Sequence, residues 1–475
     1  MMRYSSCTMS GNNQLRRLPS PGNCRAVEMA SDGGQLTIVL NVCQKSDVED
    51  SPTEDEIVDP WCDPDNPRVL SMAEVDAAYA VLQGKVMRTP CTKSRLGERL
   101  RVRELYFKKE FLQYTGNFKE RGAAHVLHKL KRGVPAVRGA VSASAGNHAA
   151  AMAYHGRREG VPVVVVMPVG APRVKVQSCE EFGATVLLHG ANMADAKRRG
   201  LRYARDEGMV YVNGFDHPDV LAGAASVAKE ALEDVPQLDA FVVPVGGGGL
   251  LAGVCVVAKA AGKMVIGVES DTCAGFSAAL AAGRPAPAPV APSVADGLAV
   301  PVVGYNAFAT AAPLVDRVAV VEERWLAQAM LDLLEAEKAV VEGAGASGLA
   351  LLKSGRLGAL LADKVVCVVL TGGNVDTAVL GRCVDRALAA AGRLLHFTVR
   401  LEDRPGALPE LLGALGELGA NVVRMTQTRP WIQMQLWEVD VTLVVEVVGR
   451  AAADVLTRSL EERYGARFRL EPIPE

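Results

Sequence analysis

A single lysine, Lys119, stands out as a candidate for covalent chemistry. It lies in the stretch Thr115–Ala123 (TGNFKERGA), directly after the aromatic residue Phe118 and before small residues that open a predicted helix. A free lysine ammonium has a pKa near ~10.4 and is a poor nucleophile at neutral pH, so a catalytic lysine must be desolvated or held as an imine. The alternative is a solvated surface charge, one among 52 lysines and arginines.

A second candidate site is the segment Ser142–His148 (SASAGNH), between a short predicted strand at 139–141 and a helix predicted over Ala149–His155. Small residues leave the backbone N–H groups at a helix start free to bind an anion, and Asn147 adds an amide donor. A substrate carboxylate would suit this segment. A plain helix cap made by Ser and Asn is the alternative.

The strongest single motif is a run of four glycines: Gly246, Gly247, Gly248 and Gly249. They follow a strand predicted over Ala240–Val245 and precede a helix predicted over Leu250–Ala261. Residues without a Cβ let the backbone wrap around a phosphate at a helix start. The loop lacks the Gly-Lys-Ser/Thr of a nucleotide P-loop and the spacing of a dinucleotide fingerprint, so it indicates another phosphate cup or, alternatively, a tight turn.

A fourth loop, Thr371–Asn374 (TGGN), ends a strand predicted over Lys364–Leu370. Thr371 can offer its hydroxyl to a ring nitrogen of a cofactor. A hydroxyl does not hold a positive charge on a pyridine as a carboxylate does, which favours elimination over transamination.

Alternating strands and helices must position these loops. A helix is predicted over Met72–Leu82, and a strand over Leu105–Lys108 enters the Lys119 loop, with a helix beyond it from near Arg121. The segment Val161–Met167 is nearly pure valine, as expected of a parallel strand that is buried on both faces. The pattern predicts an α/β architecture.

In order and spacing these loops resemble those of the threonine dehydratase and serine racemase group of fold-type II pyridoxal phosphate enzymes. The motifs are Asn117–Lys119, Ser144–His148, Gly246–Gly249 and Thr371–Asn374, and the likeness covers about residues 70 to 390. The resemblance implies an α/β catalytic body of the tryptophan synthase β type over residues 68–392, in two subdomains. It also implies pyridoxal 5'-phosphate as the cofactor.

The resemblance further implies roles for individual residues. Lys119 is the Schiff-base lysine, Phe118 lies beside the cofactor ring and Asn147 contacts its phenolic oxygen. The four glycines hold the cofactor phosphate, Thr371 lies at the ring nitrogen and Glu342 lies near the ring side. The substrate is expected at Ser144, Ala145, Gly146, Asn147 and His148, together with Phe215. Phe215 belongs to a predicted loop, 214–218, that either faces the substrate or merely joins two elements.

The chain departs from that family's pattern at three places. Ala145 stands where serine racemases carry the serine that acts as the second base, which argues against racemisation. Glu269 matches one ligand of the family's divalent-cation site, but Gly275 replaces the second acid, so no metal site is expected. The segment Ala224–Ser226 replaces the family's Gln-Gly-Thr, and the sequence does not show the consequence.

Composition narrows the class of protein. The 475 residues are 49% hydrophobic and 22% charged, which is typical of a globular chain with two or three domains. A formal net charge of −2 provides no basic field for nucleic acid, and a small metabolite is the better expected partner. Ten cysteines without a Cys-x-x-Cys pair indicate neither a zinc knuckle nor a disulfide framework, and the longest apolar runs are too short to span a membrane.

Residues 1–67 differ from the rest of the chain. The basic, serine-containing opening up to Arg25 could be a mitochondrial transit peptide, although it lacks an obvious amphipathic helix. The acidic, proline-containing part that follows is typical of disorder. We expect a cytoplasmic protein, with a mitochondrial location as the alternative, and a folded body that begins near Arg68.

The C-terminal residues 393–475 predict a separate ferredoxin-like module. A strand over His396–Glu402, a turn, and a helix with leucines at helical spacing begin a βαββαβ order. The turn Asp403–Gly406 (DRPG) resembles that of ACT domains, small regulatory modules that often bind amino acids between paired copies. This implies an effector site at Asp403, Gly406 and Asn421; the alternative is a dimerisation module without a ligand.

Together these features predict an L-threonine and L-serine ammonia-lyase of amino-acid catabolism or isoleucine biosynthesis, assembled as a homodimer or homotetramer. An amino-acid racemase of the serine racemase type and a cofactor-binding amino-acid sensor are the alternatives. Detection of 2-oxobutanoate and pyruvate separates the three.

Overall fold

The computed structural model describes residues 57–133, 137–429 and 436–471. Four two-residue strands lie nearer the N-terminus: β1 Arg16–Arg17, β2 Cys24–Arg25, β3 Val27–Glu28 and β4 Val42–Cys43. The predicted transit peptide therefore lies outside the described residues. Within the described part of the chain, no helix has the length and apolar character needed to cross a membrane, and seven cysteines are free thiols.

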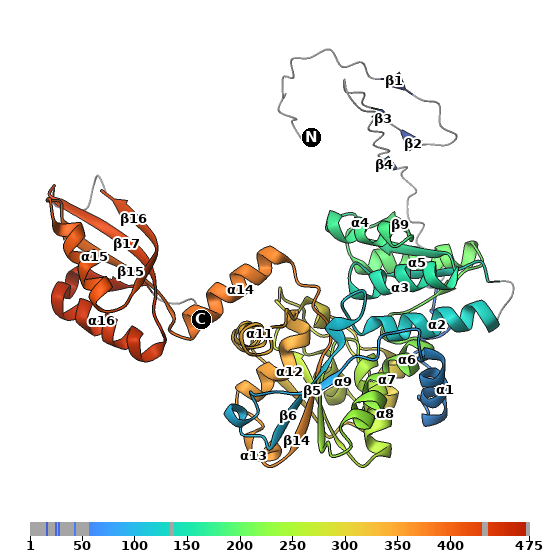
Figure 1. Cartoon of the computed structure of the whole chain (residues 1–475). Helices are drawn as coiled ribbons and strands as arrows, with labels where there is room; N and C mark the ends of the chain where they lie inside the picture. Colours follow the sequence, from blue (N-terminus) through green and yellow to red (C-terminus); the bar gives the residue numbers. More distant parts are fainter. Residues whose placement is uncertain are drawn as a thin grey trace. The chain divides into compact units, whose positions relative to one another are not determined.

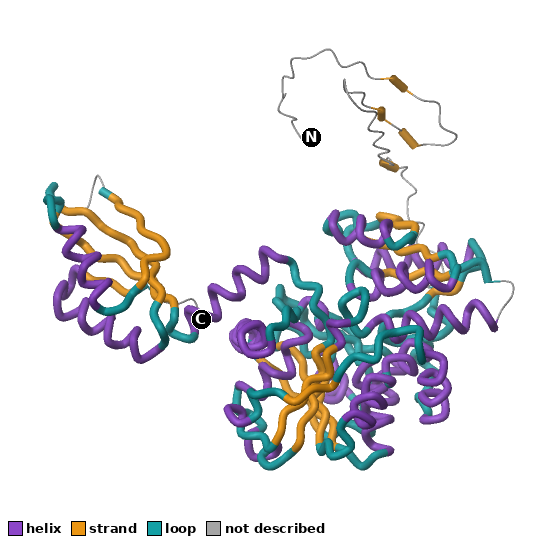
Figure 2. The backbone as a smooth tube through the Cα atoms, in the orientation of Figure 1, coloured by secondary structure: helices purple, strands orange, loops and turns teal. Residues whose placement is uncertain are grey.

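The larger of two parallel sheets has six strands in the order β13-β12-β11-β14-β6-β5, and only the edge strand β5 runs antiparallel. The strands are β5 Cys91–Lys93, β6 Glu104–Lys109, β11 Ala240–Pro244, β12 Met264–Ser270, β13 Arg317–Val321 and β14 Val365–Leu370. Every residue of β11 and β14 is buried. Helices cover both faces of this sheet (Figure 2), and this explains the continuous apolar sequence of its central strands.

Two apolar cores flank the larger sheet. One contains helices α11 Glu323–Glu337, α12 Gly343–Lys353 and α14 Thr377–Ala390. The other contains α1 Met72–Leu82, α6 Pro218–Ala224, α7 Ser226–Asp234, α8 Gly249–Ala260, α9 Gly275–Ala282 and α10 Tyr305–Ala311. A short helix, α13 Gly358–Leu361, precedes β14. The helix predicted at 72–82 is confirmed, and its N-terminus is fixed by a capping box between Ser71 and Glu74.

The smaller sheet is fully parallel in the order β10-β7-β8-β9. Its strands are β7 Ala140–Ala143, β8 Val163–Met167, β9 Thr185–Leu188 and β10 Val210–Tyr211. One core holds α2 Lys119–Gly133, α3 Asn147–Glu159 and α4 Arg173–Glu181, and the other holds α5 Met193–Asp206. The edge strand β9 lies beside α4 and α5 in the green part of the ribbon (Figure 1). The two sheets confirm the predicted α/β body.

Two helices begin earlier than the sequence predicts. The predicted start near Arg121 is wrong because the Asn117 side-chain oxygen accepts the Lys119 N–H at 2.9 Å and caps α2 there. Helix α3 begins at Asn147 rather than Ala149, since the Gly146 carbonyl already accepts the Ala150 N–H at 3.3 Å. Both shifts place a candidate site residue on the first turn of a helix.

The C-terminal module has the predicted βαββαβ order. Its elements are β15 Leu394–Glu402, α15 Ala407–Glu417, β16 Asn421–Thr428, β17 Glu438–Glu446, α16 Arg450–Tyr464 and β18 Phe468–Leu470. The antiparallel strand order β16-β17-β15-β18 is the ferredoxin-like one. The module has its own core, centred on Phe397, Leu411 and Leu456.

Candidate active site

Lys119 lies on the first turn of α2, and its ammonium has no acidic partner in the part of the chain that the structure describes. The Nζ atom donates to the Gly214 carbonyl at 2.5 Å and lies 5.0 Å from the centre of the Phe118 ring. Part of the side chain meets solvent, but protein surrounds the ammonium and the loss of hydration lowers its pKa to about 8. The amine therefore becomes available as a base or nucleophile close to neutral pH.

The loop after β14 is joined to the Lys119 loop by backbone contacts. The Phe118 N–H donates to the Thr371 carbonyl at 2.9 Å, and the Gly373 N–H donates to the Gly116 carbonyl at 2.9 Å. Asn117 and Gly372 form an isolated antiparallel bridge between these two pairs. The structure thus brings the predicted residues Phe118, Lys119 and Thr371 together at the carboxyl ends of β6 and β14, where ligands of open α/β sheets bind.

Asn147 connects the second predicted loop to Glu342. Its side-chain nitrogen donates to Glu342 Oε1 at 2.9 Å, while its oxygen accepts from Asn374 at 2.8 Å. Glu342 is buried, and burial raises its pKa to about 7 although the Asn147 hydrogen bond favours the carboxylate. Asn374 also donates to the Thr115 carbonyl at 2.8 Å, so these side chains join four segments: the Lys119 loop, the loop after β14 and the starts of α3 and α12.

The glycine run forms the turn between β11 and α8, and Phe215 packs directly against it. A Cβ on Gly247 would lie 2.3 Å from the Phe215 ring, and one on Gly249 would lie 2.5 Å from the Phe215 carbonyl. Gly248 has φ of 91°, a left-handed conformation that favours glycine. No side chain caps α8, so the N–H groups of its first turn remain available to an anion.

The predicted substrate loop is arranged similarly at α3. No side chain caps this helix at Gly146, whose N–H donates to Ser144 Oγ at 3.4 Å. Ala145 is half-buried and packs against the core beneath α3. His148 is buried, and its ring lies so close to Gly214 that a Cβ there would be 2.4 Å from it.

The buried His148 ring is neutral. Neither ring nitrogen has a hydrogen-bond partner of good geometry among the described residues. Burial, together with the nearby Lys119 charge, lowers its pKa to about 3, and a weaker interaction with the Val212 backbone opposes that shift. His148 therefore adds no positive charge next to the Lys119 ammonium.

Beneath α2 lies a buried ion-pair cluster that sequence reasoning missed. Arg121 binds Glu110 at 2.7 Å and Glu230 at 2.8 Å, and Glu230 also binds Lys108 at 2.6 Å. Burial works against ionisation of Glu110, but Arg121 and Lys108 lower its pKa on balance. No local pattern indicates this cluster, because Arg121 and Glu230 are 109 positions apart and each of its four members has another ionisable residue next to it in sequence.

Glu269, matched in sequence to a metal ligand, has other partners. Its carboxylate accepts hydrogen bonds from the Phe276 N–H at 2.6 Å and from the Ser277 N–H at 2.9 Å and hydroxyl at 2.6 Å. It therefore binds the first turn of α9. Within the described ranges, no cluster of three or more His, Cys, Asp or Glu side chains is arranged to hold a metal ion.

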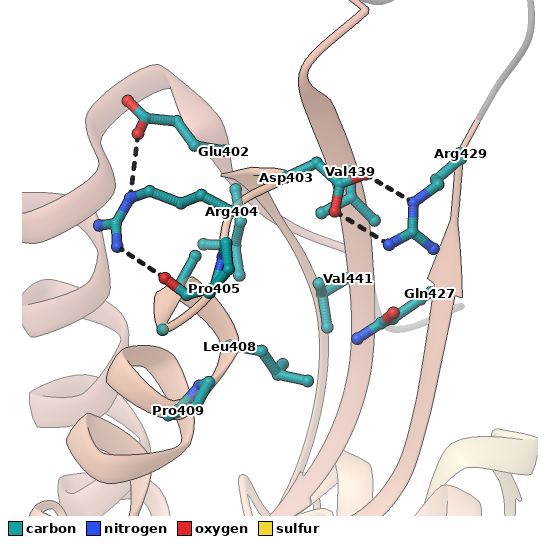
Figure 3. Close-up of a pocket in the computed structure, with 13 residues that line it drawn as sticks. Glu402, Asp403, Arg404, Pro405, Leu408, Pro409, Gln427, Arg429, Val439 and Val441 are labelled. Atoms are coloured by element: carbon teal, nitrogen blue, oxygen red, sulfur yellow. Dashed lines mark hydrogen bonds and ion pairs between the residues drawn. The ribbon is translucent and has the colours of Figure 1, made fainter.

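The C-terminal module contains a cavity of about 250 Å³ beside the turn after β15 (Figure 3). Its lining includes Asp403, Gly406, Gln427 and Arg429, and Arg429 forms a bidentate ion pair with Asp403 at 2.7 and 2.9 Å. Asn421, predicted beside Asp403, lies at the opposite end of β16.

The strand register explains that difference. Asn421 pairs with Glu446, whereas Thr428, at the other end of β16, pairs with Asp440 next to the cavity. The sequence showed a strand here but not which of its ends faces the turn.

Comparisons with known proteins agree with this geometry. The family model described as "Pyridoxal-phosphate dependent enzyme" matches residues 82–372, and the ACT domain model matches residues 397–457. An L-threonine ammonia-lyase of Thermotoga maritima is 36% identical over 398 residues, covering 82% of this chain and 97% of the relative. An L-threonine ammonia-lyase of Geobacter sulfurreducens is 38% identical over 371 residues, covering 78% and 91%.

The structure of maize serine racemase superposes with a TM-score of 0.62 at 29% identity, covering 68% of this chain and 99% of that one. Lyases and a racemase thus share this fold, so the fold does not by itself choose the reaction. The Lys119 ammonium, unpaired among the described residues, and the uncapped glycine turn fit the family model that matches residues 82–372. The chain therefore belongs to the pyridoxal-phosphate dependent enzyme family, with an ACT domain at its C-terminal end.

Proposed function

We propose that the chain is a pyridoxal-phosphate dependent L-threonine ammonia-lyase that also accepts L-serine. The observation that carries this proposal is Lys119, whose ammonium is surrounded by protein without a counter-charge. Its support comes from relatives named L-threonine ammonia-lyases that match most of the chain. Ala145, which offers no second base, supports a lyase over a racemase.

The residues of the site fit the cofactor. A lysine without an acidic partner suits imine formation, and the side-chain-free turn at Gly246–Gly249 suits a phosphate. Phe118 and Asn147 would hold the ring, and the Thr371 hydroxyl would hold its nitrogen. When bound, the cofactor supplies an electron sink for the negative charge that develops as the substrate's Cα–H bond breaks.

The chain's own residues supply the remaining functions. The α3 N-terminus, with Ser144 and Asn147, would bind the substrate carboxylate and orient the Cα–H bond toward Lys119. The Lys119 amine would take the Cα proton, and the Cβ hydroxyl would leave as water. A water molecule would then hydrolyse the resulting enamine, giving ammonia and 2-oxobutanoate from threonine or pyruvate from serine. Glu342 and Asn374 would fix the Asn147 amide.

The decisive experiment measures 2-oxobutanoate and pyruvate formation side by side with L-threonine and L-serine. A lyase forms both 2-oxo acids, and Lys119→Ala forms neither. Accumulation of D-serine without pyruvate would instead support a racemase. Binding of amino acids without turnover would support a sensor.

We propose further that an amino acid such as isoleucine or valine binds the cavity beside Asp403 in paired C-terminal modules. The backbone N–H groups at the start of α15 suit a carboxylate, while Asp403 suits an ammonium and is held in place by Arg429. Because an effector must bind two states with different affinity, we expect a change of ~5- to 150-fold in apparent substrate affinity.

Deletion of residues 393–475 tests this regulatory proposal. Basal activity should remain while the response to amino acids is lost. If calorimetry detects no proteinogenic amino acid bound to the intact chain, and kinetics are indifferent to all of them, the module only assembles subunits.

A further inference from the structure

Residues 57–70, which we call the N-terminal strap, precede the family match at 82–372 and cross from one subdomain to the other. At one end Ile57 packs against the core between the smaller sheet and α5. At the other end the Leu70 N–H donates to Thr310 Oγ1 on α10 at 3.0 Å. The strap was expected, from its acidic and proline-rich sequence, to belong to a disordered extension up to residue 67, yet its residues have specific partners.

The strap is fastened to the loop Asn213–His217 through one buried amide. Asn306 donates to the Trp61 carbonyl at 2.7 Å and to the Asp216 carbonyl at 2.8 Å, and its oxygen accepts the Arg68 N–H at 2.7 Å. The side-chain nitrogen and oxygen of Asn306 therefore both form hydrogen bonds, two of them to the strap and one to the loop. Asn306 is almost completely buried, so these bonds have little competition from water.

Side chains of the strap also contact the same loop directly. The Trp61 ring lies 5.0 Å from the His217 ring, and the Arg68 guanidinium lies over Trp61 at 5.2 Å. Cys62 is buried and its thiol interacts with the carboxylates of Asp59 and Asp216. The Asp216 carboxylate in turn accepts the Tyr305 and Ala307 N–H groups at 2.9 Å each.

The loop Asn213–His217 contacts two parts of the active site. The Gly214 carbonyl accepts from Lys119 Nζ at 2.5 Å, and Phe215 packs beneath Gly247 and Gly249. A shift of this loop would therefore change the surroundings of the lysine and of the phosphate turn together. Among the described residues, no hydrogen bond or ring contact joins the strap to Lys119 or the glycines. Its influence passes through this loop and through the start of α10, where the Gly304 N–H donates to the Gly247 carbonyl at 2.9 Å.

We propose that the N-terminal strap is a positioning element that holds the Gly214 carbonyl against Lys119 and Phe215 against the glycine turn. Trp61 is its key side chain, because it packs on His217 while its carbonyl binds the Asn306 amide that also holds Asp216. The inference rests on the proposed function in assigning Lys119 to the cofactor.

The test compares Trp61→Ala, Trp61→Phe and the control Val69→Ala in the full-length chain. Val69 lies on the strap but its side chain is exposed. The first measurement uses the cofactor-free chain: the pH dependence of Lys119 acetylation by acetic anhydride is read by peptide mass spectrometry, with the exposed Lys338 as internal reference. The second measurement is the rate at which the loaded enzyme releases its cofactor, followed by absorbance.

In the intact chain Lys119 should react with a midpoint near its lowered pKa of about 8. Trp61→Ala should admit water beside the ammonium and move the midpoint upward by about one unit toward the ordinary lysine value of ~10.4. Cofactor release should be about tenfold faster, since the phosphate turn loses support; each tenfold corresponds to 1.4 kcal/mol. Trp61→Phe should restore most of both properties, and Val69→Ala should match the wild type.

A lower melting temperature for Trp61→Ala with an unchanged labelling midpoint and unchanged cofactor release would overturn the proposal, because the strap would then only stabilise the fold. If Trp61→Ala does not fold, Trp61→Leu, which keeps apolar bulk over His217, gives the same comparison. Labelling is measured without cofactor or substrate, so its result does not depend on the proposed function. The proposed function fails on a separate result, namely catalysis that survives in Lys119→Ala.

Discussion

Two lysines, Lys108 and Lys119, have ammonium groups enclosed by this protein, and they differ in what neutralises them. Lys108 is completely buried and bonds to the Glu230 carboxylate at 2.6 Å and the Thr89 carbonyl at 2.5 Å. Lys119 bonds only to the Gly214 carbonyl among the described residues, and its pKa falls to about 8. The first lysine belongs to a neutralised ion-pair cluster, whereas the second is kept ready to lose its proton.

The two lysines are connected through α2. Arg121, two residues after Lys119, joins the Lys108 cluster through Glu230 and Glu110. Glu120 also acts on the same turn: it accepts the Thr115 N–H, and its other oxygen lies 3.1 Å from His155 Nε2. The helix start that presents Lys119 is thus held by ion pairs and by a hydrogen-bonded carboxylate. The contrast between the paired Lys108 and the unpaired Lys119 predicts which substitutions affect chemistry and which affect folding.

The largest expected effect is the loss of activity in Lys119→Ala. No other amine can replace it as base and cofactor anchor, so turnover should fall by at least ~10⁴-fold and the absorbance band of bound cofactor should disappear. The melting temperature of the cofactor-free chain should not fall, because an unpaired enclosed charge is removed. An absorbance band that persists in this variant would contradict the assignment.

Replacing Lys108, the lysine with an acidic partner, should lower the stability of the fold instead of removing the chemistry. Lys108→Met leaves Glu230 with fewer counter-charges in a buried site, which typically costs ~3 to 5 kcal/mol of stability. Denaturant unfolding of cofactor-free Lys108→Met and Lys119→Met measures both on the same scale. Equal free energies of unfolding for the two variants would show that the ion pair of Lys108 does not contribute to stability.

The sequence predicted the fold well because local signals dominate there. Valine runs at β8 and β14, the helix at α1 and the glycine turn before α8 are each determined by a few adjacent residues. Lys119 and Thr371 could be selected in the same way, since each lies next to small residues at a strand end or helix start.

The rest of the site depends on contacts between distant segments. Asn147 and Glu342 are 195 positions apart, and Arg121 and Glu230 are 109 apart, so no local pattern pairs them. The misplaced Asn421 has the same origin, because strand register decides which end of β16 meets the cavity. The strap was predicted to be disordered for a related reason. Its polar composition is typical of disordered segments, and the residues that bind it, Asn306 and His217, are far away in sequence.

A third test extends the contrast to carboxylates. Glu110 is buried beside Arg121 and its pKa is lowered on balance, whereas Glu342 is buried with only amide donors and burial raises its pKa to about 7. As pH rises from about 4.3 to 7, the unfolded chain loses the Glu342 proton first. Ionisation then favours unfolding, so the free energy of unfolding falls through this window by about 4 kcal/mol and is constant above it.

Glu342→Gln should remove this contribution. The wild type minus variant difference in unfolding free energy, measured on cofactor-free chains, should decrease between pH 4.5 and pH 7. Glutamine keeps an oxygen for the Asn147 amide, so the hydrogen bond survives. A difference that is independent of pH would mean that Glu342 ionises normally.

The smallest expected effect concerns the face of the substrate opposite Lys119. Ala145 carries no titratable group, so only one base acts on the Cα position, and elimination should greatly exceed racemisation. Ala145→Ser places a hydroxyl on the half-buried position beside the α3 N-terminus, where the helix dipole favours its deprotonated form. A well-placed acid or base contributes a rate factor of ~10² to 10⁴. A hydroxyl without a further partner should contribute far less, so we expect D-serine formation to rise about tenfold while pyruvate formation changes little.

Chiral chromatography of the L-serine reaction measures both products at once, and Ala145→Gly serves as the control for the change in size. Comparable amounts of D-serine and pyruvate from the unmodified chain would show that a second base already exists, and Lys119 would no longer be the single enclosed base of this site.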